Sequence, residues 1–292
     1  TFGAFTNQGV LELGGGTFDT SSLDNVAGAN IFGHGTIVPR PTNSGRITAS
    51  LGNLTFTNGI QGGSGEVHVN SGASLDVSGG SSDSSADRLQ HDGVALELGD
   101  NNFLVGGDYD NANFGVGNAF NHRANVNGAG QILADPTVAQ ELTGNVTGGN
   151  TPTATMAFGN VHVGSLTSKI YRVKNAGGST VSLRGAIQTA VGGGNVTDGR
   201  LSGSGVTAGN FGPLAPGVDT LRQVDFNATT AGALTGQQVH ITNNFDNVAD
   251  QDLAITGAAY RLANPTAHSP EPVNFGIRHV GDPAPSQILS LT

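Results

Sequence analysis

Two groups of acidic and amide side chains have the spacing of loops that could bind a divalent cation. In the first group, Asp100 is followed after a short gap by Asp108 and Asp110, with asparagines nearby. The second group spans 246–252 and contains three aspartates. Ca²⁺ takes about six to eight oxygen ligands, which such loops supply. We therefore predict a calcium site at Asp100, Asp108 and Asp110 and no other cofactor. The alternative is that these residues stabilise turns without metal, as Asp and Asn commonly do.

The residue patterns of common hydrolytic sites are not found. The eight histidines form no H-E-x-x-H pair, and the sequence contains no G-x-S-x-G. A polysaccharide lyase or glycosidase needs paired carboxylates that converge on one face. Asp76, Asp83 and Asp87 are close in sequence, but the stretch 79–87 has the composition of a solvated loop. We predict that the chain is not an enzyme, and a polysaccharide lyase or hydrolase is the least favoured function.

The composition indicates a folded β protein rather than a disordered chain. The 292 residues include 47 glycines, no cysteine and only 12% charged residues. Val, Ile, Thr and Phe nevertheless recur at short intervals, which disordered segments avoid. A net charge of −10 with 12 Lys and Arg leaves no basic patch for nucleic acid. No apolar run reaches the ~18 residues of a transmembrane helix, so we predict no transmembrane segment.

The same composition favours an extracellular or cell-surface location. Acidic, lysine-poor chains are common among extracellular bacterial proteins, and the lack of cysteine excludes a disulfide framework without excluding secretion. The sequence begins at Thr1 with no signal-peptide pattern. We therefore expect a processed chain or a fragment, from which any targeting segment is already gone.

Repeated turn motifs organise the N-terminal half of the chain. An Asn, a polar residue and a Gly before a strand recur at 7–11, 43–47 and 70–75, and G-x-G before a strand recurs at 33–37, 63–67 and 128–132. The strands alternate with period two, so one side chain points inward and the next outward. Short strands joined by Asn and Gly corners predict a β-solenoid over 1–142. A hairpin-built sandwich is the alternative.

A second repeat predicts the organisation of the C-terminal half. The sequence FGNVHVG at 158–164 returns as FGIRHVG at 275–281. About seven short strands separated by Gly-, Asn- and Pro-rich turns predict an immunoglobulin-like β-sandwich over 153–264. A Gly- and Thr-rich linker over 143–152 would join it to the solenoid. Residues 265–292 would then be the first strands of a second, incomplete copy.

Short motifs through the second half follow a recognisable order. They are Phe158-Gly159, Val163-Gly164, Asn175-Ala176-Gly177, Asn210-Phe211, Leu214-Ala215-Pro216-Gly217, Val224-Asp225-Phe226 and Ile241-Thr242-Asn243-Asn244. In this order they resemble the choice-of-anchor D type of immunoglobulin-like domain in bacterial surface proteins, a relative of the ASH domain. The sequence departs from that pattern after Phe226, where such domains often have Pro, and in an inserted loop near 189–204.

The first 80 residues resemble the β-helix rungs of autotransporter passengers and large bacterial adhesins. Together the two resemblances imply secreted or cell-surface display, usually in tandem arrays, and no enzymatic activity.

The unfinished copy suggests how the chain could assemble. Its apolar strand residues are Phe275, Ile277, Val280, Ile288, Leu289 and Leu291. An unpaired strand exposes a row of backbone groups that another subunit can pair by strand addition. We therefore predict a structural subunit of a fibre, sheath or matrix that self-associates or joins tandem neighbours, with simple truncation of a longer array as the alternative origin of this segment. An adhesin or glycan-binding module, with surface glycans as partners, is the second predicted function.

Overall fold

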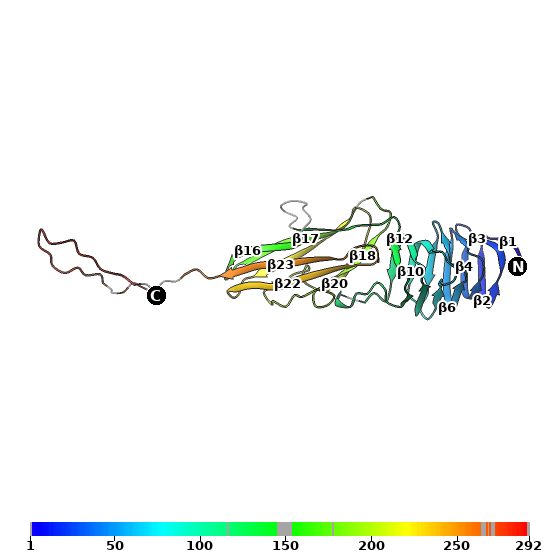
Figure 1. Cartoon of the computed structure of the whole chain (residues 1–292), viewed down its shortest axis with the longest axis horizontal. Helices are drawn as coiled ribbons and strands as arrows, with labels where there is room; N and C mark the ends of the chain where they lie inside the picture. Colours follow the sequence, from blue (N-terminus) through cyan, green and yellow to red (C-terminus); the bar gives the residue numbers. More distant parts are fainter. Residues whose placement is uncertain are drawn as a thin grey trace.

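The computed structural model describes residues 2–115, 117–144, 154–176, 178–263, 267, 269 and 272–290. Within these ranges the chain forms strands and one short 3-10 helix, Gly117–Ala119, so the predicted all-β class is confirmed. Figure 1 shows an elongated molecule, with a solenoid at the N-terminal end, a second all-β unit beside it and an extended C-terminal segment. Across the described ranges, no helix combines the length and apolarity needed to cross a membrane.

The first fourteen strands form a β-solenoid of about six turns, which confirms the solenoid predicted from the turn motifs. They are β1 Phe2–Asn7, β2 Val10–Phe18, β3 Thr20–Asn25, β4 Asn30–Ile37, β5 Thr42–Asn43, β6 Arg46–Phe56, β7 Gln61–Gly62, β8 Glu66–Val69, β9 Ser74–Asp76, β10 Ser84–His91, β11 Ala95–Gly99, β12 Phe103–Asn111, β13 Val126–Gly128 and β14 Ile132–Ala134. These strands pair in parallel: β1, β3, β5 and β7 form one sheet, and the other ten strands form a second.

Like residues stack on like residues along the solenoid core. Ile31 lies opposite Ile47, Ile47 opposite Val67, and Val67 opposite Leu89. All four side chains are fully buried. Burying a side chain of this size contributes about 1.5–3 kcal/mol. A slip of one residue in register would move this column to the outer face, so the period-two pattern specifies the pairing.

Buried asparagines form a ladder along one inner corner of the first three turns. Asn7 Nδ2 donates to Asn25 Oδ1 at 2.8 Å, and Asn25 Nδ2 donates to Asn43 Oδ1 at 2.7 Å. Each of the three also donates to a backbone carbonyl of the following turn. A Cβ on Gly45 would lie 2.3 Å from a main-chain oxygen of the preceding turn. The motif at 43–45 thus combines a ladder amide with a close backbone approach, whereas Gly9 of the first motif has open space around it and Asn70 of the third motif is exposed.

The second unit is built from two sheets. Its strands are β15 Gln140–Gly144, β16 Thr155–His162, β17 Leu166–Asn175, β18 Leu183–Gln188, β19 Leu201–Ser202, β20 Gly209–Leu214, β21 Asp219–Asn227, β22 Gly232–Asn243 and β23 Gln251–Tyr260. One sheet has the order β15-β17-β21-β19 and the other β16-β23-β22-β18-β20. Only β16 and β23 pair in parallel. The sheets meet through buried side chains such as Phe158 and Phe226, whose rings lie edge to face at 5.6 Å.

The division between the two units falls earlier than the sequence pattern suggested. The last solenoid strand, β14, ends at Ala134, and β15 pairs with β17 in the second unit. The predicted solenoid range 1–142 therefore includes the first residues of β15, and positions 143 and 144 of the predicted linker lie in that strand. The rest of the linker, 145–152, lies outside the described residues. β15 is short, and its neighbouring buried residues Leu142 and Thr143 break the alternation that marks a strand.

A loop of the second unit covers the last solenoid strand. Asp246 Oδ2 accepts the Ile132 N–H at 2.7 Å, and the Asp246 N–H donates to Ile132 O at 2.9 Å. Asn247 repeats the arrangement on Ala134, with bonds of 2.9 and 3.0 Å. These contacts satisfy backbone groups on the outer edge of β14, which would otherwise be open to another chain.

The C-terminal segment 272–290 extends beyond the second unit (Figure 1). Its described residues contain no strand, and Ser269 and Ser290 form an isolated bridge. Its backbone nevertheless repeats a feature of the β16 region. Gly276 and Gly281 have φ of 69° and 100°, and the equivalent Gly159 and Gly164 have φ of 70° and 94°.

Candidate functional site

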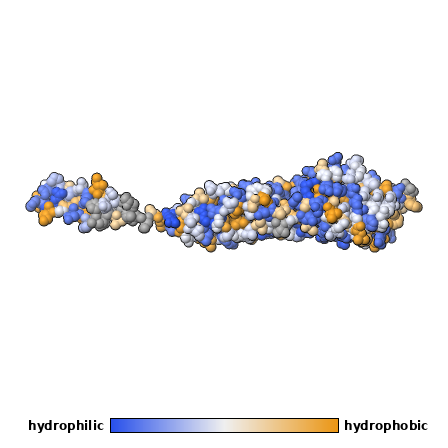
Figure 2. Space-filling model, turned by 90° about the horizontal axis from the view of Figure 1, so that it is seen from below, coloured by the Kyte–Doolittle hydropathy of each residue, from blue (hydrophilic) through white to orange (hydrophobic). Residues whose placement is uncertain are grey.

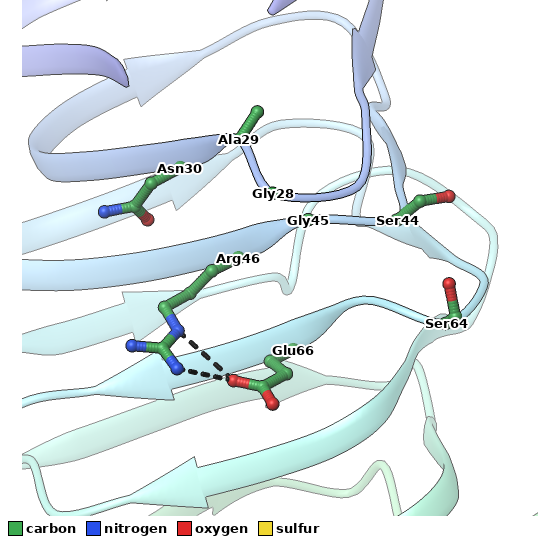
Figure 3. A pocket seen from close by; sticks show the side chains of 8 residues that line it. All are labelled: Gly28, Ala29, Asn30, Ser44, Gly45, Arg46, Ser64 and Glu66. Carbon is green, nitrogen blue, oxygen red and sulfur yellow. Dashed lines mark hydrogen bonds and ion pairs between the residues drawn. The ribbon is translucent and has the colours of Figure 1, made fainter. Parts of the chain in front are cut away.

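A polar groove lies on the solenoid where strands β4, β6 and β8 begin. It encloses about 420 Å³, and Figure 3 shows its lining residues. Arg46 and Glu66 point toward each other at one end, while Ser44 and Ser64 lie at the other (Figure 3). These residues come from equivalent positions of successive turns, because Arg46 and Glu66 are paired in the parallel register of β6 and β8.

Glu66 is the electrostatic centre of this groove. Its Oε2 accepts from Arg46 Nη2 at 2.9 Å and lies 3.1 Å from His68 Nε2. Burial favours the neutral acid, but the contacts with Arg46 and His68 outweigh it and hold the pKa of Glu66 below its usual value. Burial and the charge of Arg46 lower the pKa of His68, against the opposing effect of Glu66. Near neutral pH the groove therefore offers the charged carboxylate of Glu66 as an acceptor, with the uncharged imidazole of His68 behind it, which suits polar binding better than proton donation.

The groove belongs to a longer column of alternating charge. In register along the outer face lie Arg46, Glu66, Arg88 and Asp108, one on each of four neighbouring strands. Arg184 of β18 continues the column into the second unit through its ion pair with Asp108. Opposite charges on adjacent strands stabilise their pairing. The column thus runs from the groove to the contact between the two units.

The predicted calcium ligands do not come together. Arg184 Nε and Nη2 each donate to an oxygen of Asp108 at 2.9 Å, and Nη2 lies 3.3 Å from Asp110. Asp100 is exposed in the turn after β11. Within the described ranges, no group of three or more His, Cys, Asp or Glu side chains is arranged to hold a metal ion. The prediction of a site at these three aspartates is corrected, because the guanidinium of Arg184 already provides the positive charge between Asp108 and Asp110.

The second acidic group is divided between two structural roles. Asp246 Oδ1 lies 2.8 Å from His122 Nε2, and its Oδ2 accepts from Arg123 Nη1 at 2.9 Å. Asp250 and Asp252 instead flank His240, at 3.5 and 2.7 Å from its two ring nitrogens. Asp246 therefore belongs to the contact between the units, whereas the other two aspartates lie beside a histidine of β22.

The predicted strand-donating residues lie on the extended C-terminal segment. Ile277, Val280 and Ile288 are almost completely exposed, while Phe275 and Leu289 are about half exposed. Leu291 lies outside the described residues. Figure 2 shows apolar residues in small patches among polar ones on the face of the molecule that it views. Exposed apolar side chains of this size, close together on one segment, mark a surface that could be buried against a partner.

Two arginines that sequence reasoning passed over proved informative. Arg184 joins the two units through its pair with Asp108, 76 positions away in the chain. Arg40 lies in a second hollow on the solenoid, among serines. Neither belongs to a motif, because a lone arginine in a β-rich sequence carries no local signal of its partner. No protein-family model and no curated protein matches the sequence, so its function is argued from its own residues.

Proposed function

We propose that this chain is a structural unit of an extracellular fibre, sheath or matrix, and that the segment 265–292 joins it to a neighbouring unit. The role is mechanical rather than catalytic. The observation that carries the proposal is the C-terminal segment, which repeats both the sequence and the glycine conformations of the β16 region without forming a strand in its described part.

The place of β16 suggests what the segment would do. β16 lies at the edge of the five-stranded sheet and pairs in parallel with β23. Met156, Phe158 and Val161 of β16 are buried. Phe275, the equivalent of Phe158, is about half exposed, and Val273, the equivalent of Met156, is partly exposed. A neighbouring unit could bury them by strand addition, in which backbone hydrogen bonds supply affinity and the apolar side chains supply specificity.

The contact between the two units supports a mechanical role for the chain. Charged and amide side chains from the second unit bond to the last turns of the solenoid at Asp108, Ile132 and Ala134. Asn244 Nδ2 adds a bond to Tyr109 O at 2.8 Å. This polar, partly buried contact would resist hinge motion between the units.

The second unit is proposed to be an immunoglobulin-like sandwich of the choice-of-anchor D type. Two sheets of four and five strands, with β16 in parallel to the last strand β23, are consistent with that architecture. The motif order through 151–264 supports the same proposal. The solenoid and the C-terminal segment lie at opposite ends of the second unit (Figure 1), as a chain that joins its neighbours end to end requires.

The full chain and a Phe275→Asp, Val280→Asp double variant would be compared by light scattering after gel filtration and by negative-stain microscopy. We expect the full chain to form larger assemblies as concentration rises, and we expect the double variant and a chain lacking 265–292 to stay monomeric. Val94→Asp is the matched control, because Val94 is an exposed apolar residue, 60% accessible, on the solenoid. A monomeric wild type, or a double variant that assembles as the wild type does, would contradict the proposal.

A further inference from the structure

A second hollow on the solenoid surrounds an arginine with neutral hydrogen-bonding groups. It encloses about 450 Å³ and lies at one corner of four successive turns. The polar residues that line it are Ser21, Ser22, Arg40, Asn58, Ser81 and Ser82. The four serines and Asn58 are exposed, and Arg40 is half-buried beneath them. Hydroxyl groups both donate and accept hydrogen bonds, so the lining can match a ligand that carries hydroxyls.

Arg40 differs from three other arginines of the solenoid and its junction, whereas Arg88 of β10 shares its buried, unpartnered Nε but does not line this hollow. Arg46, Arg123 and Arg184 each pair with a carboxylate at 2.9 Å. Arg40 Nη2 donates to the main-chain oxygen of Asp83, and its Nε is buried without a hydrogen-bond partner. No carboxylate in the described part of the chain forms an ion pair with it.

The surroundings of Arg40 leave its charge available to a ligand. Asp83, whose main chain it contacts, directs its carboxylate elsewhere, to the N–H and the side-chain amide of Asn102 at 2.8 and 3.3 Å. Binding of an anion to a half-buried guanidinium that lacks an anionic partner is favourable, because charge-assisted hydrogen bonds are stronger than neutral ones.

We propose that this hollow binds a uronic-acid residue of an acidic polysaccharide, with its carboxylate on Arg40. The planar guanidinium matches the two oxygens of a carboxylate. The ring hydroxyls of the sugar would meet the serines and Asn58. The volume lies in the lower part of the range of about 300–1,000 Å³ typical of small-molecule sites, which leaves room for one or two sugar rings. No aromatic residue lines the hollow, so the carboxylate rather than ring stacking must provide the selectivity.

Titration calorimetry of the full chain with trigalacturonate tests this site, at about 0.15 M salt so that long-range repulsion from the net charge of −10 is screened. We expect saturable binding that Arg40→Gln weakens at least about tenfold. Arg222→Gln is the matched control, because Arg222 of β21 is also half-buried with a buried Nε that lacks a hydrogen-bond partner, and this variant should bind within about twofold of the wild type. Ser22→Asp places a carboxylate in the hollow from an exposed position and should weaken binding as Arg40→Gln does, so the test survives if the latter variant misfolds.

Three outcomes would overturn the proposal. The first is no saturable binding of trigalacturonate up to about 20 mM. The second is equal affinity in the wild type and in folded Arg40→Gln. The third is an affinity for neutral maltotriose or for inorganic sulfate that equals or exceeds the affinity for the uronate. The hollow is remote in sequence from 265–292, so assembly and sugar binding can fail independently.

Discussion

Replacing Asp246 with alanine tests whether the loop after β22 fastens the solenoid to the second unit. The carboxylate lies 2.8 Å from His122 Nε2 and accepts from Arg123 Nη1 at 2.9 Å and from the Ile132 N–H at 2.7 Å. Its side chain is only 12% exposed. The substitution would leave the Ile132 N–H at the edge of β14 without its acceptor and would remove the carboxylate partner of Arg123.

The expected cost follows from these contacts. A hydrogen bond to a charged group contributes about 1.5–3 kcal/mol, and breaking a fully buried ion pair from one side costs about 3–5 kcal/mol. Arg123 keeps its bonds to two main-chain oxygens, of Gly130 and Gly128. We therefore expect Asp246→Ala to lower the free energy of unfolding by about 2–4 kcal/mol. For a chain of this size that corresponds to a fall in Tm of about 5–15 °C.

Scanning calorimetry and hydrogen exchange would measure the effect. Calorimetry should show a lower Tm or a separation of the melting of the two units, because their contact is weakened. Exchange of the Ile132 amide should accelerate, since its hydrogen-bond acceptor is lost. Asp100→Ala is the control, because Asp100 is exposed and makes no hydrogen bond or ion pair among the described residues. An unchanged Tm together with unchanged protection at Ile132 would refute the reasoning.

The pH dependence gives an independent check of the same contact. Burial raises the pKa of Asp246, but the contacts with His122, Ile132 and Arg123 outweigh it and hold the pKa below the usual 3.8. A carboxylate with a lowered pKa in the folded state stabilises the fold above its unfolded pKa, and this stability is lost as pH falls through the folded value. The difference in Tm between the wild type and Asp246→Ala should therefore be full at about pH 7 and shrink below about pH 4. A difference that grows on acidification would contradict this assignment.

Three further predictions concern the solenoid and the predicted metal site. Asn25→Ala removes the central member of the asparagine ladder and should destabilise the chain by about 2–3 kcal/mol in urea unfolding, because its neighbours lose buried partners. Gly45→Ala should destabilise it by more than about 2 kcal/mol, since a Cβ would meet main-chain oxygen at 2.3 Å, whereas Gly9→Ala, with open space, should be nearly neutral. Millimolar Ca²⁺ should not raise Tm, because Arg184 already forms hydrogen bonds to the carboxylate of Asp108. If Ca²⁺ raised Tm and Mg²⁺ did not, that result would support the predicted calcium site instead.

Features with a local cause could be predicted from the sequence. Alternation at period two identified the inward-facing residues of strands such as β8, whose Val67 and Val69 are buried. The Asn and Gly corners identified the turns, because these residues accept the backbone conformations and close approaches that corners require. Asn25 shows the limit of such patterns: it completes the ladder between Asn7 and Asn43 but lies outside any N-x-G motif.

Features that depend on distant residues could not be predicted in this way. The acidic groups at 100–110 and 246–252 suggested metal loops, because carboxylate spacing carries no information about a remote cation. In the folded chain Asp108 meets Arg184, and Asp246 meets His122 across 124 positions. The same limitation applies to Arg40, whose surroundings come from four separate turns.

The sequence by itself therefore determined that the chain is all-β and that its N-terminal half is a solenoid, since both follow from the short-range periodicity of strands and corners. Only the tertiary structure decided where the solenoid ends, which charges neutralise one another and which arginines remain without a carboxylate. These depend on how turns stack and how the second unit docks on β14, and neither leaves a pattern among neighbouring residues.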